Sequence, residues 1–168
     1  WNLYDFSSEI RDEGGLKHKN GKGLITFDRK IKKDAYYYYM AQWSSKPFVK
    51  IAQSRFVKRE QPEICITVYS NQKEVDLYVN QNCYKGFSES GVFHFHKIAL
   101  GQGENRVKAV SGEWEDEAMF CGVTEKELSY VYVDSNPGLN VKNWFTDVVE
   151  EERMFPKGMF SIRESCKD

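Results

Sequence analysis

The sequence lacks any long apolar run and any excess of charge of one sign. No stretch approaches the roughly 18 consecutive apolar residues that a membrane-spanning helix needs. The 24 lysines and arginines nearly balance the 25 aspartates and glutamates, which leaves a formal net charge of −1. Nucleic acids and anionic membranes attract proteins through clustered positive charge. We therefore expect no nucleic-acid partner and no membrane partner.

The cysteines are few and irregularly spaced. They are Cys65, Cys83, Cys121 and Cys166. Their spacing contains no C-x-x-C pair of the kind that binds zinc, and it gives no support to a disulfide. Cys65 lies in an apolar run, so we predict that it is a small buried side chain. Free thiols are typical of reducing compartments, which makes the cytoplasm the expected location.

Histidines are rarer still, and the familiar nucleophile and nucleotide-binding motifs are missing. His94 and His96 alternate along a predicted strand and therefore share one face. A solvent-facing pair is the favoured interpretation, and a pair of metal ligands is the alternative. The sequence contains no G-x-S-x-G elbow, no P-loop and no dinucleotide-binding glycine motif. We predict no cofactor and no metal site.

Residues 1–45 form the first of three segments. They begin with the aromatic run WNLYDF, continue through a polar loop from Ser7 to Gly23, and end in RKIKKDAYYYYMAQW. We predict a helix over residues 29–43, because apolar and aromatic side chains recur there at helical spacing. Pro47 lies shortly beyond the predicted end, which is where a helix commonly stops.

Residues 46–120 form the clearest segment, a series of short apolar runs separated by turn residues. The runs are FVKIA, RFVKR, EICITVYSN, EVDLYVNQ, GVFHFHKIAL, ENRVKAVSG and EWEDEAMF. About seven strands at intervals of roughly 8–12 residues are typical of an all-β, immunoglobulin-like sandwich. Aromatic residues make up 15% of the chain and suit such a core. We therefore predict an all-β fold class.

Residues 121–168 are less regular, and we predict an irregular C-terminal extension. LSYVYVD, residues 128–134, has the pattern of a strand. NPGLNVKNWF, residues 136–145, has that of a turn leading into an apolar anchor. GMFSIRES, residues 158–165, would add a final short strand.

Carboxylates are plentiful in the first segment but show no catalytic spacing. They are Asp5, Glu9, Asp12, Glu13 and Asp28. Retaining glycoside hydrolysis requires two carboxyl groups about 5–5.5 Å apart across the scissile bond, and this spacing predicts no such pair. We expect surface or structural roles and name no catalytic residue. Asp28 and Arg29 are expected to form a structural polar pair between a strand and the helix.

The first segment resembles a known family. WNLYDF, followed by NGKGLITFDRKIKKDAYYYYMAQWS, resembles the end of the catalytic (β/α)8 barrel of glycoside hydrolase family 2, which contains β-galactosidases and β-glucuronidases. ITVYSN and VDLYVN resemble the Ig-like domain that follows the barrel in many bacterial β-galactosidases. The resemblance implies that residues 1–45 are the last strand, loop and helix of the barrel, residues 46–120 the sandwich, and residues 121–168 an extension. A barrel remnant alone cannot close, so residues 1–45 are expected either to be disordered or to dock their aromatics on the sandwich or on another copy.

The resemblance also implies substrate-binding residues. Trp1 matches the strand-eight tryptophan that forms the floor under the sugar, with a barrel-core role as the alternative. Asn20 and Lys22 match the N-x-K pattern that recognises the sugar carboxylate in β-glucuronidases. The alternative is an asparagine that orders the loop and a solvated lysine. The acid/base and nucleophile glutamates of the family lie on earlier barrel strands, so the chain by itself is expected to be inactive.

The expected function is that of the C-terminal part of a retaining bacterial β-galactosidase acting on β-linked galactosides. The chain begins at Trp1 rather than at a methionine, so we expect an internal residue of a longer protein. A β-glucuronidase of the same family is the first alternative, and a homo-oligomer is compatible with either.

A carbohydrate-binding module is the alternative from another class, and an adhesion domain would rest on the fold alone. A binding module would present exposed aromatics on one sandwich face, for example Tyr78, Tyr84, Phe93 and Phe95. Alternation places Phe93 and Phe95 opposite the two histidines, so we expect them to point into the core.

Overall fold

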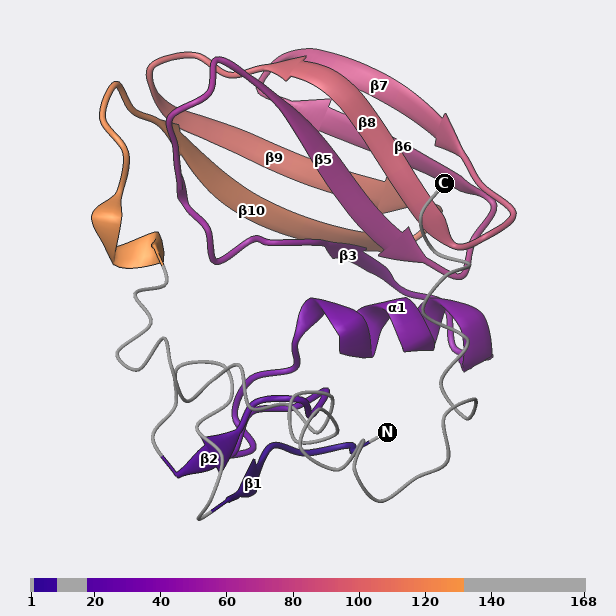
Figure 1. Cartoon of the computed structure of the whole chain (residues 1–168). Coiled ribbons are helices and arrows are strands. Elements are labelled where there is room, and N and C mark those ends of the chain that lie inside the picture. Colours follow the sequence, from indigo (N-terminus) through magenta and orange to yellow (C-terminus); the bar gives the residue numbers. More distant parts are fainter. Residues whose placement is uncertain (1, 9–17, 132–168) are drawn as a thin grey trace, which may run out of the picture.

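The computed structural model describes residues 2–8 and 18–131, and its main body is a sandwich of two β-sheets (Figure 1). Five strands form one sheet in the order β4-β10-β9-β6-β7, and three form the other in the order β3-β5-β8. The strands are β3 (Val49–Ile51), β4 (Lys58–Arg59), β5 (Glu63–Ser70), β6 (Glu74–Val79), β7 (Asn82–Phe87), β8 (Val92–Ala99), β9 (Gly103–Ser111) and β10 (Trp114–Gly122). The prediction of an all-β, Ig-like sandwich is confirmed.

Alternating side chains build the core between the two sheets. Phe93 and Phe95 of β8 are 2% and 6% exposed, which confirms that they point inward. His94 and His96 lie on the opposite face of β8 and are exposed. Their ring centres are 6.0 Å apart, and His94 Nδ1 lies 3.1 Å from the Thr67 hydroxyl across the strand pair. The predicted solvent-facing histidine pair is therefore confirmed.

The prediction that Cys65 is buried is wrong. Ile64 and Ile66 occupy the core face of β5, so the period of two along the strand turns the Cys65 side chain outward. Cys65 and Cys83 are exposed free thiols, and Cys121 is a half-buried one. Cys166 lies outside the described residues.

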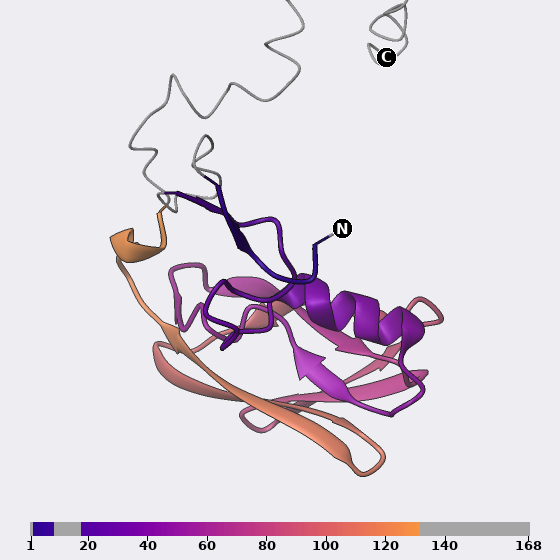
Figure 2. The ribbon, with the colours of Figure 1, turned by 90° about the horizontal axis from the view of Figure 1, so that it is seen from below.

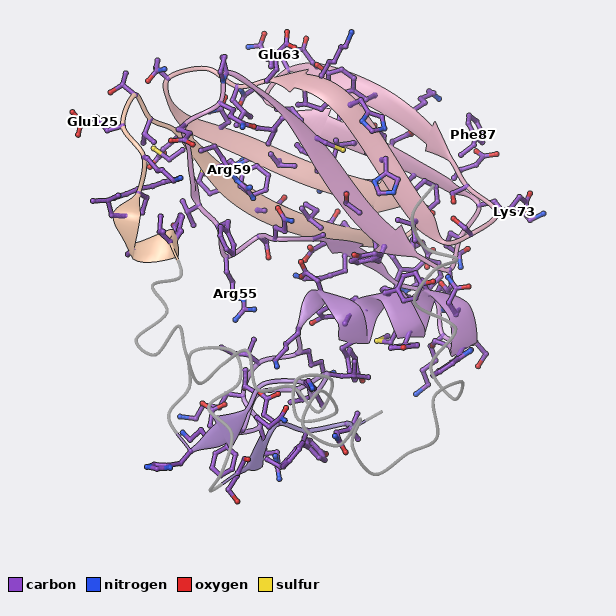
Figure 3. All side chains as sticks on the ribbon, in the orientation of Figure 1. Arg55, Arg59, Glu63, Lys73, Phe87 and Glu125 are labelled. Atoms are coloured by element: carbon purple, nitrogen blue, oxygen red, sulfur yellow. The ribbon has the colours of Figure 1, made fainter. Side chains whose placement is uncertain are left out.

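One strand of the sandwich was missed. β7 pairs only with β6 and forms an edge of the larger sheet. Its side chains are half-buried or exposed, so NCYKGF shows none of the apolar alternation from which the other strands were predicted. Phe87, at the end of β7, is 71% exposed and points away from the sandwich (Figure 3). The partner β6 supplies the hydrogen bonds that make this polar stretch a strand.

A smaller N-terminal part packs against the sandwich. It contains β1 (Phe6–Ser7), β2 (Lys19–Asn20) and α1 (Asp34–Trp43), and α1 lies between the β1–β2 pair and the sandwich (Figures 1 and 2). The Tyr38 ring meets the Tyr69 ring of β5 edge to face, with 6.2 Å between ring centres. The Asp34 carboxylate accepts a hydrogen bond of 2.9 Å from the backbone amide of Gln53. Of the two expectations for residues 1–45, docking of an aromatic residue on the sandwich is observed.

The predicted helix exists, but it begins at Asp34 rather than at residue 29. Arg29 has a φ of 65°, a left-handed conformation that a helix cannot continue through. The Lys33 amide donates to the Leu24 carbonyl at 2.9 Å, so the chain folds back on itself before α1 starts. Asp28 shapes this turn by accepting from the Thr26 hydroxyl at 2.6 Å and from the Lys30 amide at 3.1 Å.

The expected Asp28–Arg29 pair is not what the structure shows. The Arg29 guanidinium lies 3.9 Å from the centre of the Tyr4 ring and donates to the Asp5 carbonyl at 3.4 Å. From its left-handed backbone position, Arg29 also donates to the Phe27 carbonyl at 3.3 Å, so its guanidinium joins the turn to the N-terminal residues. Both residues are structural, but with different partners.

The predicted strand at residues 128–134 is also wrong where the structure describes it. Leu128–Tyr130 is a short 3₁₀ turn, η1, because the Glu127 carboxylate accepts from the Ser129 amide and caps it. The Tyr130 ring packs on Phe56, with 4.9 Å between ring centres. The predictions for residues 136–145 and 158–165 lie outside the described residues. Among residues 2–8 and 18–131, no helix is long and apolar enough to cross a membrane.

Docking of η1 is expected to depend on pH. Hydrogen bonds from Lys58 and Ser129 hold the pKa of the Glu127 carboxyl at about 2, below its ordinary value of 4.5. A lowered folded-state pKa contributes stability that is complete above about pH 4.5 and is lost as the pH falls toward 2. NMR signals of the Tyr130 ring should move in that window, and Glu127→Gln should abolish the dependence. An equal pH response in Glu127→Gln would contradict this assignment.

Candidate functional site

The N-x-K loop, residues 20–23, is held between two pairings to the same N-terminal segment, residues 2–8. Before the loop, β2 pairs antiparallel with β1, with Asn20 opposite Phe6. After the loop, the chain runs parallel to residues 2–5. The Ile25 amide donates to the Leu3 carbonyl, and the Asp5 amide donates to the Ile25 carbonyl, each at 2.9 Å. Both ends of the loop are therefore tied to one short segment.

Asp5 lies beneath the loop and is 2% exposed. Its Oδ1 accepts from the Gly23 amide at 2.8 Å and from Lys33 Nζ at 2.6 Å. A buried carboxylate is tolerated when it is paired and hydrogen-bonded, and both conditions are met here. Lys33 Nζ also donates to the Gly21 carbonyl at 2.6 Å, so one ammonium joins the carboxylate to the loop backbone.

The two predicted ligand-binding residues of the loop differ in exposure. Asn20 is 6% exposed, and its Oδ1 accepts from the Lys22 amide at 3.0 Å, which forms an Asx turn. The Lys22 side chain is exposed. The loop-ordering role that was the alternative for Asn20 is thus present in the structure. The loop thus presents the Lys22 side chain to solvent, whereas the Asn20 amide that orders the loop is buried.

Gly23 is required by close packing of the backbone. A Cβ at this position would overlap the Asp5 amide nitrogen and the Tyr4 carbonyl. These atoms belong to the main chain that pairs with the loop, so they cannot rotate away as a side chain would.

The structure brings Asn20 and Lys22 into one loop, whereas Trp1 lies outside the described residues. Asp5 and Lys33 were not predicted as parts of the site. A signal existed for Asp5, since an aspartate within an aromatic strand run must be paired if it is buried. No sequence signal distinguished Lys33 from the neighbouring lysines.

Two of the candidate carboxylates of the first segment, Asp5 and Asp28, are described by the structure and have structural partners. Asp5 is engaged in the ion pair with Lys33. Hydrogen bonds from Thr26 and the Lys30 amide lower the pKa of the Asp28 carboxyl, so it is ionised at neutral pH and cannot serve as a general acid. Glu9, Asp12 and Glu13 lie outside the described residues. Within the described ranges, no three His, Cys, Asp or Glu residues are grouped to hold a metal ion.

Two curated proteins share part of this sequence. A β-glucuronidase from Bacteroides fragilis is 35% identical over 114 residues, which are 66% of this chain and 16% of that protein. A putative β-glucuronidase from Formosa agariphila is 37% identical over 84 residues, which are 48% of this chain and 10% of that protein. The chain therefore spans a small fraction of the length of the relatives it matches. No protein-family profile matches it.

Solved structures of glycosidases also match part of this chain. An FMN-binding β-glucuronidase from Faecalibacterium prausnitzii L2-6 superposes on 79% of this chain with a TM-score of 0.74 and 36% identity, over 20% of its own length. A putative β-galactosidase from Bacteroides fragilis covers 75% of this chain with a TM-score of 0.68 and 36% identity, over 20% of its length. Over these regions, the chain is homologous to β-glucuronidase and β-galactosidase-like glycoside hydrolases of family 2.

Proposed function

We propose that this chain forms the C-terminal part of a retaining family 2 glycosidase that cleaves terminal β-glucuronides. The observation that carries the proposal is the geometry of the N-x-K loop. In this loop, Lys22 is exposed and its backbone amide is held by the Asn20 side chain. An ammonium and an amide N–H₂ are suitable partners for the carboxylate that distinguishes a glucuronide from a galactoside. The names of the curated relatives agree with this substrate class.

A β-galactosidase is the second candidate. It was the first expectation from the sequence, and the putative β-galactosidase from Bacteroides fragilis supports it at 36% identity. A neutral galactoside offers no carboxylate to Lys22, so this candidate assigns the lysine no role in substrate recognition. The two candidates therefore differ in one residue that can be tested.

The chain would contribute a wall of the sugar site and not the catalytic carboxylates. Under this proposal, residues 1–45 end the barrel, residues 46–120 are the accessory sandwich, and residues 121–168 extend it. Trp1 would form the floor under the sugar. The general acid and the nucleophile would be supplied by other parts of the complete protein, and this chain alone would be inactive.

A carbohydrate-binding module is less well supported. Phe93 and Phe95 are buried and cannot stack on a sugar, and Tyr84 is half-buried against the core. Tyr78 is 39% exposed and by itself makes no platform.

The proposal predicts a selective defect when Lys22 is replaced with Met in the complete protein. Loss of a charge-assisted hydrogen bond to a carboxylate should lower kcat/KM for an aryl β-glucuronide by about 10²-fold, because such a contact is worth roughly 1.5–3 kcal/mol or more. Hydrolysis of an aryl β-galactoside should change little. Steady-state kinetics on both substrates would measure the ratio of kcat/KM for the glucuronide to kcat/KM for the galactoside.

Lys30→Met is the matched control, because Lys30 is an exposed lysine in the turn before α1. It should leave both substrates unaffected. A complete protein that prefers the galactoside, or a Lys22→Met variant with an unchanged ratio, would favour the β-galactosidase. Turnover by the isolated chain would contradict the assignment of the catalytic carboxylates to other parts of the protein.

A further inference from the structure

We propose that the Asp5–Lys33 ion pair positions Lys22, and that it connects the N-x-K loop to the sandwich. The inference rests on the function proposed above and extends it to two residues outside the N-x-K pattern. Neither residue is assigned contact with substrate. Each acts through the backbone of the loop.

The main chain on both sides of Lys22 is held by side chains. Asn20 Oδ1 accepts from the Lys22 amide at 3.0 Å, and Asp5 Oδ1 accepts from the Gly23 amide at 2.8 Å. The Gly21 carbonyl accepts from Lys33 Nζ at 2.6 Å. Three consecutive residues are thus fixed at their backbones, which places the Lys22 Cα and limits the directions that its side chain can take.

Asp5 and Lys33 depend on each other. The Asp5 side chain is 2% exposed and that of Lys33 is 26% exposed, at a separation of 2.6 Å. Removing either partner leaves a charge that is wholly or largely buried without its counter-ion, so the surroundings must rearrange to hydrate it. The loop peptides at Gly21 and Gly23 are bonded directly to the pair, so a rearrangement of the pair acts on them.

The pair also joins the loop to the sandwich through adjacent residues. Lys33 reaches the loop, while Asp34, the first residue of α1, accepts from the Gln53 amide of the sandwich at 2.9 Å. The contact between the rings of Tyr38 and Tyr69 holds the same helix on β5. The position of Lys33 Nζ is therefore set by the packing of α1 on the sandwich, which gives the sandwich a role in substrate recognition.

The test uses Asp5→Asn and Lys33→Met in the complete protein, with Lys30→Met as the control. Asp5→Asn keeps an oxygen for the Gly23 amide but removes the charge. Both variants should lower kcat/KM for an aryl β-glucuronide by about 10- to 100-fold, mostly through KM, because a misplaced binding group costs up to about 10²-fold. The galactoside rate should change far less. Lys33→Arg, which keeps the cation, should recover part of the loss.

A second readout needs no activity. In the present chain, hydrogen exchange at the Lys22 and Gly23 amides should accelerate at least tenfold in Asp5→Asn and Lys33→Met, while exchange in the sandwich strands stays unchanged. A purely structural pair would lower activity on both substrates equally, and that result would overturn the inference. If Lys22→Met alters the substrate ratio but Asp5→Asn and Lys33→Met do not, only this inference fails. If Lys22→Met has no selective effect, the proposed function fails.

Discussion

Replacing Asn105 with Asp is expected to destabilise the sandwich by about 3–5 kcal/mol, the cost of burying a charge without a partner. Asn105 is 1% exposed. Its Nδ2 donates to the Gly101 carbonyl at 2.8 Å and to the Gly103 carbonyl at 2.9 Å. Its Oδ1 accepts from the Gly101 amide at 2.9 Å and from Asn80 Nδ2 at 3.0 Å. The side chain thus joins the loop before β9 to the turn after β6.

An aspartate of the same size has no N–H to donate when it is ionised. The carbonyls of Gly101, Gly103 and Phe120 would lose their donor, and a carboxylate would face them in the interior. Because burial disfavours the charged form, the folded variant should have a raised pKa at this position. The loss in free energy of unfolding, relative to the native protein, should therefore be smallest below the unfolded pKa of about 4. It should grow as the pH rises.

Urea unfolding at several pH values would measure this effect. Asn82→Asp is the matched control, since Asn82 is exposed on β7 and its change should stay within about 0.5 kcal/mol. Equal losses in the two variants, or a deficit independent of pH, would show that the Asn105 network does not stabilise the sandwich as described.

Replacing Gly23 with Ala is expected to separate the N-x-K loop from the N-terminal segment, residues 2–8. The added Cβ would overlap the backbone of Tyr4 and Asp5. Overpacking of this kind costs about 1–3 kcal/mol or more, and backbone atoms have no alternative rotamer that relieves it. The amides of Asp5 and Ile25, which bond across this pairing, should lose most of their protection from hydrogen exchange.

The effect should remain local. The amide of Val107, in the centre of the larger sheet, should keep its protection because β9 is paired on both sides. Gly101→Ala is the control, since a Cβ there would lie an ordinary 3.5 Å from Asn105 Oδ1. Unchanged exchange at Asp5 and Ile25 in Gly23→Ala would mean that the loop tolerates a side chain, and the requirement for glycine would be wrong.

Apolar alternation was sufficient to predict most of the sandwich. EICITVYS and EVDLYV became β5 and β6 because their core-facing residues recur with a period of two, which only a strand can bury on one face. The same rule placed Phe93 and Phe95 inside and His94 and His96 outside. It was applied wrongly to Cys65, whose apolar neighbours take the core face.

Other elements of the fold could not be predicted from the sequence pattern of their own residues. β7 is a strand because β6 offers it a hydrogen-bonding edge, and its own residues bury little. The start of α1 depends on the left-handed Arg29 and on the return of the chain to Leu24, which are tertiary arrangements. The 3₁₀ turn at Leu128–Tyr130 is stabilised partly by Lys58 and Phe56, which are distant in sequence.

By itself, the sequence determined the all-β class, which side chains of its apolar strands face inward, and the N-x-K pattern in a loop that resembles glycoside hydrolase family 2. These depend on short-range periodicity and on a contiguous motif. Only the tertiary structure decided that Asp5 is buried, that Lys33 rather than another lysine pairs with it, and that Gly23 admits no side chain. The physical reason is that burial and ion pairing depend on which distant segments meet, and residues 5, 23 and 33 come together only when the strand, the loop and the helix start have folded against one another.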